Sequence, residues 1–472
     1  MSTIAQFDQK LRREFSSIVG EENVIDDEKR LVSYTQDSSP FQSVPACIAL
    51  KPASVQEISK IMKLANDHGV KVGVRGLGLS MTGRDTLDPQ RTITIDTTRL
   101  NKIREVDEGN MVVRVECGAV MGDIERELAK RGLYIHTVTV PLDYVTLGGV
   151  LSGVVGGGLP QRRPLYGTGV NFVLGLRVVL PDGSLLSTGA GGSNIHQKID
   201  YIKGGNGPDV LGLFIGDGGI FGVKVEATLQ MFPEPVQKQG GMKIFKNFVD
   251  AWKALSKLMM LEPLPFSRLR IIDRGVDYSM EYVVESSARE LLVASEGILV
   301  RIARECGGIE GTEEEQEAAR NLPFTSEMRN EKFVKQSRYY VSFMSERGGF
   351  PSIYKEIRGL ILGEISANGL DKSGAEVRMA FQPTLRNSMF CTFNVQFDPE
   401  NERNRSGVLA LGNRAYEKVI ELGGSPQPHQ GFGADLMSRY WSKEYREVMR
   451  RIKRVLDPNL VLNPTVWNMN SL

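Results

Sequence analysis

The sequence predicts an α+β protein, because segments with helical and with strand-like periodicity follow one another along most of its 472 residues. Three observations carry this prediction. A strand–helix–strand unit occupies residues 45–76, apolar strands separated by glycines fill residues 148–222, and helices alternate with strands after residue 236. Because glycine weakens a strand, so many glycines are best explained by backbone that wraps closely around a bound group.

Charge and hydropathy exclude several classes of protein. The 58 basic and 57 acidic residues nearly cancel, so no overall field directs the chain to nucleic acid or to an anionic membrane surface. Residues 1–15 predict an amphipathic helix and not a signal peptide, since they carry charges and no apolar core. No apolar run is long enough to span a bilayer. These features predict a cytoplasmic protein.

The four cysteines form no metal or redox motif. Cys47, Cys117, Cys306 and Cys391 are scattered, without a C-x-x-C pair, which excludes an iron–sulfur cluster or a zinc knuckle made by this chain alone. We expect all four to be small buried side chains in a reducing compartment.

The first unit along the chain is defined by its end signals. "PACIAL" (45–50) has a strand-like composition, and Ser54 with Glu57 forms the capping box of an amphipathic helix. Gly69 ends that helix. The next strand leads directly into "RGLGLSMTG" (75–83), so this loop is expected at the end of a strand.

The loop 75–83 predicts an anion site that belongs to neither common phosphate-binding type. A dinucleotide fingerprint would need a third glycine at the position of Met81, and a P-loop would need Lys and then Ser or Thr where Arg84 and Asp85 stand. The loop still offers backbone N–H groups in a turn that glycine tolerates, which suits an anion. A purely structural turn is the alternative.

The remaining elements follow from periodicity and turn residues. Asp182-Gly183 predicts a hairpin turn, and "FPEPV" (232–236) marks a boundary. The expected strands are residues 91–96, 111–118, 223–232 and 389–397, with a hairpin over 175–186. The expected helices are residues 121–130, acidic helices within 285–320, and a final helix over 442–456.

In this order the segments resemble those of the vanillyl-alcohol oxidase/p-cresol methylhydroxylase (PCMH-type) superfamily of FAD-dependent oxidoreductases. The resemblance covers nearly the whole chain, and the common order of the motifs makes it specific. It is carried by "RGLGLSMTG", "ITIDTTRLNKI", "VPLDYVTLGGVLSGVVGGGLPQRRPLYGTG", "VLGLRVVLPDGSLL", "DVLGLFIGDGGIFGV" and "IKRVLDPNLVLNP".

The resemblance implies a PCMH-type FAD-binding domain of two α+β subdomains plus a cap domain with an antiparallel sheet and flanking helices. The expected parts are an N-terminal helical segment (1–39), the FAD-binding domain (40–233), the substrate or cap domain (234–430) and a C-terminal segment (431–472) that returns to the FAD-binding domain.

The implied cofactor is FAD, with its pyrophosphate on the loop 75–83. Because residues 76–83 contain no histidine, we expect the flavin to be held without a covalent link through this loop. The cofactor-binding residues that the resemblance implies are Arg75, Gly76, Leu77, Gly78, Leu79, Ser80, Gly83, Val140, Pro141, Thr146, Leu147, Gly149, Gly153, Gly157, Gly158, Tyr166, Gly222, Val223 and Asn463.

The chain falls between two branches of this superfamily. The branch that oxidises 2-hydroxy acids usually carries a paired-histidine metal motif and a later Glu-His-Gly-x-Gly. Here "FQPTLRNSMFCTF" has no histidine and "GGSPQPHQGFG" keeps His429 without the glutamate, so no metal is expected. The 4-alkylphenol branch has a Tyr-Arg pair that is missing near Pro426–Pro428, although "STGAGG", "NGPDVLGLF" and "RLRIIDR" look like that branch.

The candidate catalytic residues are His429, Arg268 and Arg270. By resemblance His429 faces the isoalloxazine, and an imidazole suits removal of a hydroxyl proton while hydride leaves for flavin N5. The two arginines are candidates to bind a carboxylate or a phenolate. The alternatives are an ordinary turn histidine and solvated arginines on a surface strand. His136 is expected in the core or at a strand edge, with a position facing the flavin as its alternative.

The leading functional hypothesis is an FAD-dependent dehydrogenase that takes hydride from a hydroxyl-bearing carbon. A 2-hydroxy acid is favoured, because the chain is compact and its loop is nearer to that branch. The alternatives are oxidation of an aromatic alcohol or 4-alkylphenol, and a non-catalytic flavin-binding electron-transfer or assembly subunit. The chain has no motif to receive electrons, so we expect a separate redox partner: an iron–sulfur protein, flavoprotein, cytochrome or quinone.

Overall fold

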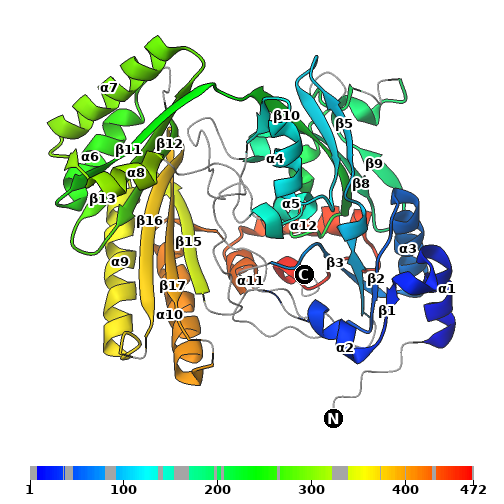
Figure 1. The fold of residues 1–472 in the computed structure, drawn as a ribbon. Coiled ribbons are helices and arrows are strands. Elements are labelled where there is room, and N and C mark those ends of the chain that lie inside the picture. The colour runs from blue at the N-terminus through cyan, green and yellow to red at the C-terminus, as the bar shows by residue number, and fades with distance from the viewer. Residues whose placement is uncertain are drawn as a thin grey trace.

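The chain folds into two halves that face each other across a central region, as the computed structural model shows (Figure 1). One half holds two sheets and the other a single large sheet. The structure describes residues 8–35, 37, 46–79, 92–136, 142–153, 169–195, 199–203, 207–262, 266–320, 338–372, 374–398, 400–427 and 432–469.

The first sheet contains the predicted strand–helix–strand unit. Its strands, in the order β1-β2-β4-β3, are β1 (Val24–Ile25), β2 (Ile48–Leu50), β4 (Thr92–Asp96) and β3 (Lys71–Arg75). Strands β2 and β3 both pair in parallel with β4, and α3 (Val55–His68) connects them. The expected caps are confirmed: Ser54 Oγ accepts from the N–H of Glu57 at 3.2 Å, and Gly69 ends the helix with φ 64°.

The N-terminal segment packs on this first sheet. Helix α1 (Gln9–Val19) buries Leu11, Phe15 and Val19 in the same core as α3, and the predicted residues 1–7 lie outside the described part. Strand β1 extends the sheet by pairing with β2. Helix α2 (Glu28–Leu31) and a 3₁₀ turn (Val32–Tyr34) follow.

The second sheet is antiparallel, with the strand order β5-β6-β10-β8-β9 and β7 paired to β10. Its strands are β5 (Ile103–Asp107), β6 (Val112–Glu116), β7 (Leu133–Ile135), β8 (Val173–Val179), β9 (Leu185–Ser187) and β10 (Val223–Pro233). The hairpin turn between β8 and β9 places Gly183 at φ 85°, as predicted. Helices α4 (Met121–Ala129) and α5 (Leu147–Ser152) share a hydrophobic core with this sheet.

The third sheet builds the other half and has the strand order β14-β11-β13-β12-β16-β17-β15-β18. Its strands are β11 (Gln237–Phe245), β12 (Phe266–Asp273), β13 (Tyr278–Ser286), β14 (Ile309–Glu310), β15 (Arg338–Glu346), β16 (Glu376–Leu385), β17 (Ser388–Gln396) and β18 (Ser425–Pro426). The described pairs in this sheet are antiparallel.

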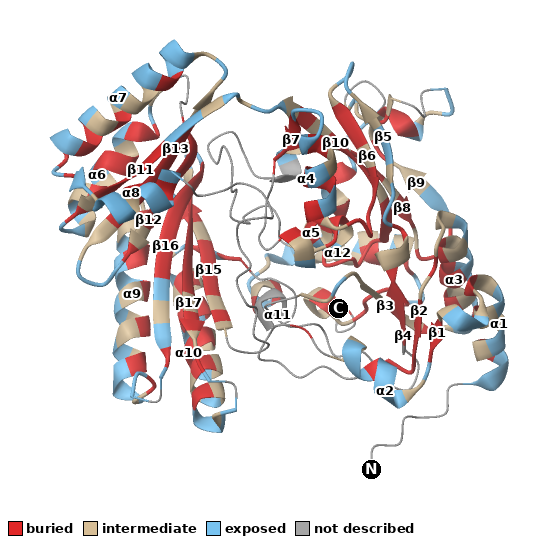
Figure 2. Ribbon diagram, viewed as in Figure 1, coloured by how far each residue is buried: buried red, intermediate tan, exposed pale blue. Residues whose placement is uncertain are grey.

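Helices cover one face of the third sheet. They are α6 (Phe248–Leu258), α7 (Arg289–Glu305), α9 (Phe350–Ala367) and α10 (Glu402–Glu421), whose buried residues join one core with the strands, while α8 (Glu313–Arg320) lies beside β11. In Figure 2 the strands are mostly buried and the outer sides of α7, α9 and α10 are exposed. The other face of the sheet is turned to the first half (Figure 1).

The C-terminal segment returns to the first half. It contains α11 (Phe432–Arg439) and the predicted final helix α12 (Lys443–Leu456), capped by Ser442. After α12 the backbone N–H of Val72 in β3 donates to Val461 O at 2.7 Å. The 3₁₀ turns within the described residues are Glu21–Asn23, Val32–Tyr34, Thr97–Arg99, Leu142–Tyr144, Gly169–Phe172, Gly189–Gly192, Leu211–Phe214 and Val466–Asn468.

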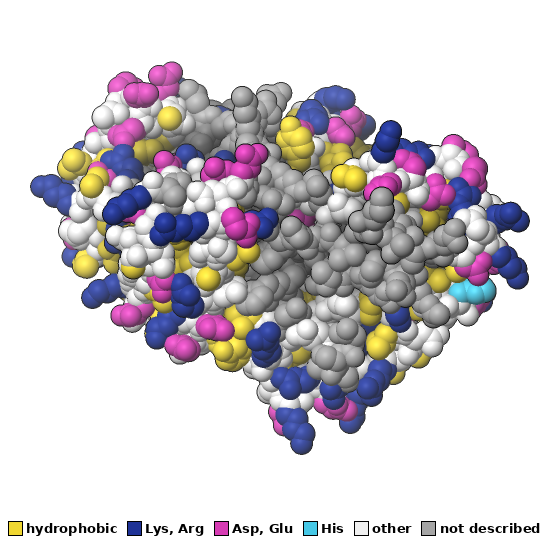
Figure 3. Space-filling model, turned by 90° about the horizontal axis from the view of Figure 1, so that it is seen from below, with side chains coloured by type: hydrophobic (Ala, Val, Ile, Leu, Met, Phe, Trp, Pro, Cys, Tyr) yellow, Lys and Arg dark blue, Asp and Glu magenta, His cyan; other side chains and the backbone are white. Residues whose placement is uncertain are grey.

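The distribution of surface charge and the burial of the cysteines agree with what the composition predicts. Basic and acidic side chains are interspersed over the face seen in Figure 3. All four cysteines are buried and unbridged, as expected. In the described residues we find no helix with both the length and the apolar character needed to cross a bilayer.

Candidate cofactor and substrate site

Four segments that lie far apart in the sequence contact one another in a closed ring in the first half. They are the loop after β3 (75–79), helix α5, the turn 216–222 before β10, and the tail 457–463 after α12. Each segment touches the next, and the tail closes the ring by pairing with β3. Two of these segments, the loop and the turn, carry a glycine at the point of contact.

The loop meets the start of α5 at a glycine. A Cβ on Gly76 would overlap the hydroxyl oxygen of Thr146. Thr146 is the N-cap of α5, and its Oγ1 accepts from the N–H of Gly149 at 3.3 Å. The backbone of the loop therefore approaches the helix start more closely than any residue with a side chain allows.

The other end of α5 holds the glycine turn. The N–H of Gly216 donates to Leu151 O at 2.9 Å, and the N–H of Gly218 donates to Ser152 O at 2.9 Å. The side-chain amide of Asn463 then donates to Gly218 O at 3.2 Å and to Gly219 O at 3.0 Å, while its backbone N–H donates to Val72 O. These bonds fix the turn, the tail and β3 relative to one another.

Two buried ion pairs stabilise the same junction. Lys224 Nζ lies 2.7 Å from Asp217 Oδ1, and Lys453 Nζ lies 2.6 Å from Asp457 Oδ2, with every side chain at most 2% exposed. Lys453 also donates to Ile220 O at 2.8 Å, which ties α12 to the glycine turn. Burial lowers the pKa of Lys453, and Asp457 opposes that shift. Nothing in the sequence pattern marked these lysines.

The loop presents backbone donors. Gly78 has φ 74°, a left-handed conformation that favours glycine. Among the described residues, none accepts a hydrogen bond from the backbone N–H of Leu77, Gly78 or Leu79. Leu77 itself is 43% exposed. Successive N–H groups in such a turn form a concavity suited to an anion.

The face of the third sheet that lies opposite the described helices holds both candidate arginines. In β12, Leu269 and Ile271 belong to the core under the helices, and Asp273 accepts from Tyr354 and Arg358 of α9. Side chains alternate along a strand, so Arg268, Arg270 and Ile272 lie on the opposite face, toward the first half.

This face is polar and carries buried charge. Arg268 is 4% exposed, and its Nη2 lies 3.2 Å from Oε2 of Glu281 on β13, whose register partner is Arg270. Farther across the sheet, Ser342 Oγ donates to Thr392 Oγ1 at 2.9 Å, and Gln382 is buried on the same face. The sequence analysis missed these partners, although the two-residue alternation of β16 and β17 contains the signal.

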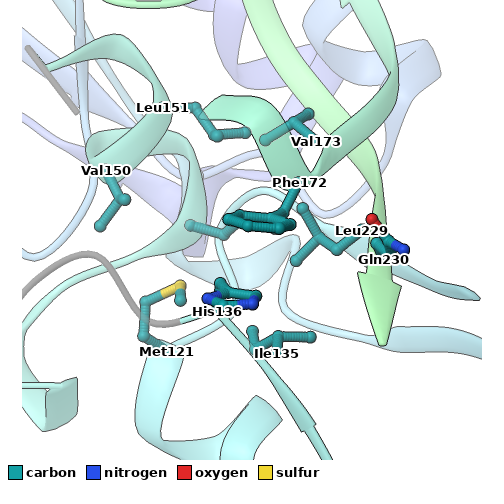
Figure 4. Close-up of a pocket in the computed structure, with 10 residues that line it drawn as sticks. Met121, Ile135, His136, Val150, Leu151, Phe172, Val173, Leu229 and Gln230 are labelled. Atoms are coloured by element: carbon teal, nitrogen blue, oxygen red, sulfur yellow. The ribbon is translucent and has the colours of Figure 1, made fainter. Parts of the chain in front are cut away.

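One further pocket lies inside the first half, between α4, α5 and the second sheet (Figure 4). It is small and has mostly apolar walls. The ring of His136 is stacked on that of Phe172, with centroids 3.7 Å apart, and meets Phe232 edge-on. His136 is 8% exposed, so it occupies the core position that was expected.

Two family models match separate regions of the chain. Residues 46–189 match the family described as FAD binding domain, and residues 388–466 match FAD linked oxidases, C-terminal domain. The chain is 25% identical to glycolate oxidase subunit GlcD of Bacillus subtilis (strain 168), over 96% of both chains, and 23% identical to D-lactate dehydrogenase of Anaerostipes hadrus, over 88% of both.

The fold has solved counterparts. The crystal structure of p-cresol methylhydroxylase with substrate bound superposes with a TM-score of 0.80, at 18% identity, over 98% of this chain and 96% of that one. The chain shares the PCMH-type fold, and its two matched regions are those of FAD-linked oxidoreductases. Its cofactor is FAD, and the predicted α+β architecture is confirmed.

The site of this PCMH-type oxidoreductase fits FAD. A pyrophosphate needs several donors close to the backbone, and the loop after β3 offers N–H groups at Leu77–Leu79, in a turn where Gly76 and Gly78 carry no side chain. The close approach at Gly76 brings the start of α5 into contact with this loop. Among the described residues, no three His, Cys, Asp or Glu side chains are placed to hold a metal ion.

Several predicted cofactor residues lie within the ring of contacts, and others take structural positions. Arg75, Gly76, Gly78 and Thr146 stand at the loop and the start of α5, as described above. Gly153 is the C-cap of α5 and Leu147 lines the pocket of His136. Gly222 packs against Val178, and the side chain of Val223 is 1% exposed in the core.

The remaining predicted residues cannot be placed. Ser80, Gly83, Val140, Pro141, Gly157, Gly158, Tyr166 and His429 lie outside the described residues.

Proposed function

We propose that this PCMH-type oxidoreductase is a dehydrogenase that oxidises the hydroxyl-bearing carbon of a small 2-hydroxy acid. The observation that carries the proposal is the face of the third sheet that lies opposite the helices. There Arg268 and Arg270 of β12 lie beside Glu281 of β13, next to the first half. Arginine binds a carboxylate through two parallel hydrogen bonds, so this face can bind an anionic substrate.

The two arginines have different roles in this proposal. Arg268 is buried and already paired with Glu281, so we assign it to holding that carboxylate in place. Arg270 lies beside the pair and is only partly buried, so we assign it to the substrate carboxylate. Bound FAD supplies the hydride acceptor. His429, outside the described residues, accepts the proton of the substrate hydroxyl.

The names of the relatives support the same substrate class. Glycolate and D-lactate are both 2-hydroxy acids, and two relatives that span most of this chain are named for oxidising them. p-Cresol methylhydroxylase supports the rival class, a phenolic or aromatic substrate, through its similar fold. The two classes differ in the carboxylate, which is the group that Arg270 would bind.

Anaerobic reduction of the bound flavin tests the proposal. The purified protein is mixed with glycolate, D-lactate or p-cresol, and loss of the flavin absorbance near 450 nm is followed. We expect a 2-hydroxy acid to bleach the flavin. Bleaching by p-cresol alone would assign the protein to the aromatic class. No bleaching with any member of either class would favour a flavin-binding subunit without a substrate of its own.

The role of Arg270 is tested with matched arginine variants. We expect R270M to raise KM for the 2-hydroxy acid at least tenfold, with partial recovery in R270K, because the carboxylate loses its bidentate partner. R289M is the control, since Arg289 lies at the exposed start of α7 on the far side of the sheet. An unchanged KM in R270M would remove Arg270 from the site.

We also propose that a separate redox partner reoxidises the flavin. The chain has no cysteine cluster that could pass electrons on, and its four cysteines are buried apart. After reduction by substrate, air is admitted and the return of yellow colour is timed. Return over many minutes, accelerated by an artificial dye, is expected. Rapid return with stoichiometric peroxide would identify an oxidase that needs no partner.

The boundaries 40–233, 234–430 and 431–472 remain our proposal for the FAD-binding domain, the cap and the returning tail. The hydrophobic cores support the boundary near residue 233, since the core of the third sheet is built from residues 245–419, with Leu436 of the tail also buried in it. Limited proteolysis within the cap should leave FAD bound. Release of FAD by every cut in the cap would argue against this partition.

A further inference from the structure

We propose that Arg75 is a positioning residue that braces the cofactor loop on the N-terminal segment, which makes residues 33–34 part of the FAD site. Arg75 is the last residue of β3 and stands directly before the loop. Its Nη2 donates to Ser33 O at 2.9 Å and its Nη1 to Tyr34 O at 3.4 Å. Both ends of the guanidinium fork therefore point to the backbone of the N-terminal segment.

The same guanidinium supports the loop from below. A Cβ on Gly78 would overlap Arg75 Nη2, so the loop backbone packs directly on the cation. The guanidinium carbon also lies 5.7 Å from the centre of the Tyr34 ring, within the range of a cation–π contact. Arg75 thus contacts both the loop and Tyr34.

A second connection holds the N-terminal segment in place. Tyr34 donates its hydroxyl to Asp96 Oδ2 at 2.7 Å, and Asp96 is the last residue of β4, the strand that pairs with β3. Thr97 Oγ1, one residue later, donates to Arg75 O at 3.2 Å. The ends of strands β3 and β4 and the N-terminal segment therefore form one hydrogen-bonded unit under the loop.

The protonation states of Arg75 and Tyr34 preserve the hydrogen bonds of this unit. Burial lowers the pKa of Arg75, while the charges of Asp37 and Asp96 oppose that shift. A guanidinium remains protonated even so, and it has no acceptor atoms, so the carbonyls of Ser33 and Tyr34 suit it. Burial and the bond to Asp96 raise the pKa of Tyr34, so its hydroxyl stays a donor.

If Arg75 holds the loop on the N-terminal segment, its loss should change the FAD-free protein as well. Loss of the guanidinium frees two carbonyls and removes the support of Gly78, so the N-terminal segment and the loop loosen together. A direct phosphate ligand would behave otherwise: its loss would weaken FAD binding and leave the FAD-free protein unchanged.

The test compares R75M, R75K and the control R386M. Arg386 also donates to two carbonyls, Met259 O at 3.4 Å and Leu261 O at 2.8 Å, but in the cap. Hydrogen exchange of the FAD-free proteins is followed in residues 28–34 and 76–79. We expect faster exchange in both segments for R75M, a smaller change for R75K, and no change there for R386M.

FAD titration completes the test. R75M should bind FAD at least tenfold more weakly, with the same dependence of the dissociation constant on salt as the parent protein, because no phosphate contact is lost. Unchanged exchange combined with weaker binding and a flatter salt dependence would make Arg75 a phosphate ligand and overturn the proposal. Unchanged exchange and unchanged affinity would overturn it as well. If R75M does not fold, hydrogen exchange and FAD titration are measured on Y34F and R75K instead.

Discussion

Gly76 lies in direct contact with the hydroxyl of Thr146, so that a Cβ on the glycine would overlap Thr146 Oγ1. The contact joins the cofactor loop after β3 to the first turn of α5, two of the four segments that form the ring around the FAD site. Because the approach depends on a missing side chain, it offers a sharp test of the site.

Gly76→Val should force the loop away from α5 and weaken FAD binding. Overpacking of this kind costs about 1–3 kcal/mol, which corresponds to roughly a 5- to 150-fold rise in the dissociation constant. Titration of the FAD-free protein measures it. Gly359→Ala is the control, since a Cβ at Gly359 in α9 meets no atom within 4 Å. Equal affinity in the valine variant and the control would place the cofactor elsewhere.

The buried pair in α12 should dominate the stability of the tail. K453M leaves Asp457 buried without its cation, and we expect a loss of about 3–5 kcal/mol in the free energy of unfolding. Urea unfolding measures this change. R451M is the matched control on the same helix: its partner Glu447 is 2.8 Å away but both side chains are well exposed, so the expected loss stays below about 1 kcal/mol. Similar losses of unfolding free energy in K453M and R451M would contradict the expectation that the buried pair contributes more than the exposed one.

The Arg268–Glu281 pair should show strong coupling. E281L leaves the buried guanidinium of Arg268 without its carboxylate and should cost about 3–5 kcal/mol, whereas R268M/E281L should lose much less. A double-mutant cycle from denaturant unfolding gives the coupling energy. Additive losses would mean that the two side chains do not stabilise each other.

The thiols should be unreactive in the native protein. All four cysteines are buried, and burial raises the pKa of the Cys117 and Cys391 thiols, so they stay protonated at pH 8. A disulfide reagent should label none of them in the folded state and four per chain in denaturant. Rapid labelling of a native thiol at pH 8 would show that a buried site opens.

The sequence by itself determined the local elements and the cofactor. The capping box at Ser54, the glycine that ends α3 and the turn at Gly183 act over a few residues, so their residue types were enough to place them. The order of the glycine-rich motifs was enough to indicate FAD, and the comparisons bear this out. The residue pattern of β12 also indicated its two faces, because Leu269 and Ile271 alternate with arginines.

Only the tertiary structure decided what these elements do together. Strand β4 lies between β2 and β3, the tail pairs with β3, and the carbonyls that receive Arg75 come from Ser33 and Tyr34. Backbone carbonyls are present at every residue, so the residue types do not indicate which carbonyl accepts a hydrogen bond from a distant arginine. A charged side chain such as Lys453 becomes structural only when folding excludes water around it. Sequence therefore identified the chemistry of the site, and long-range packing chose the partners that hold it.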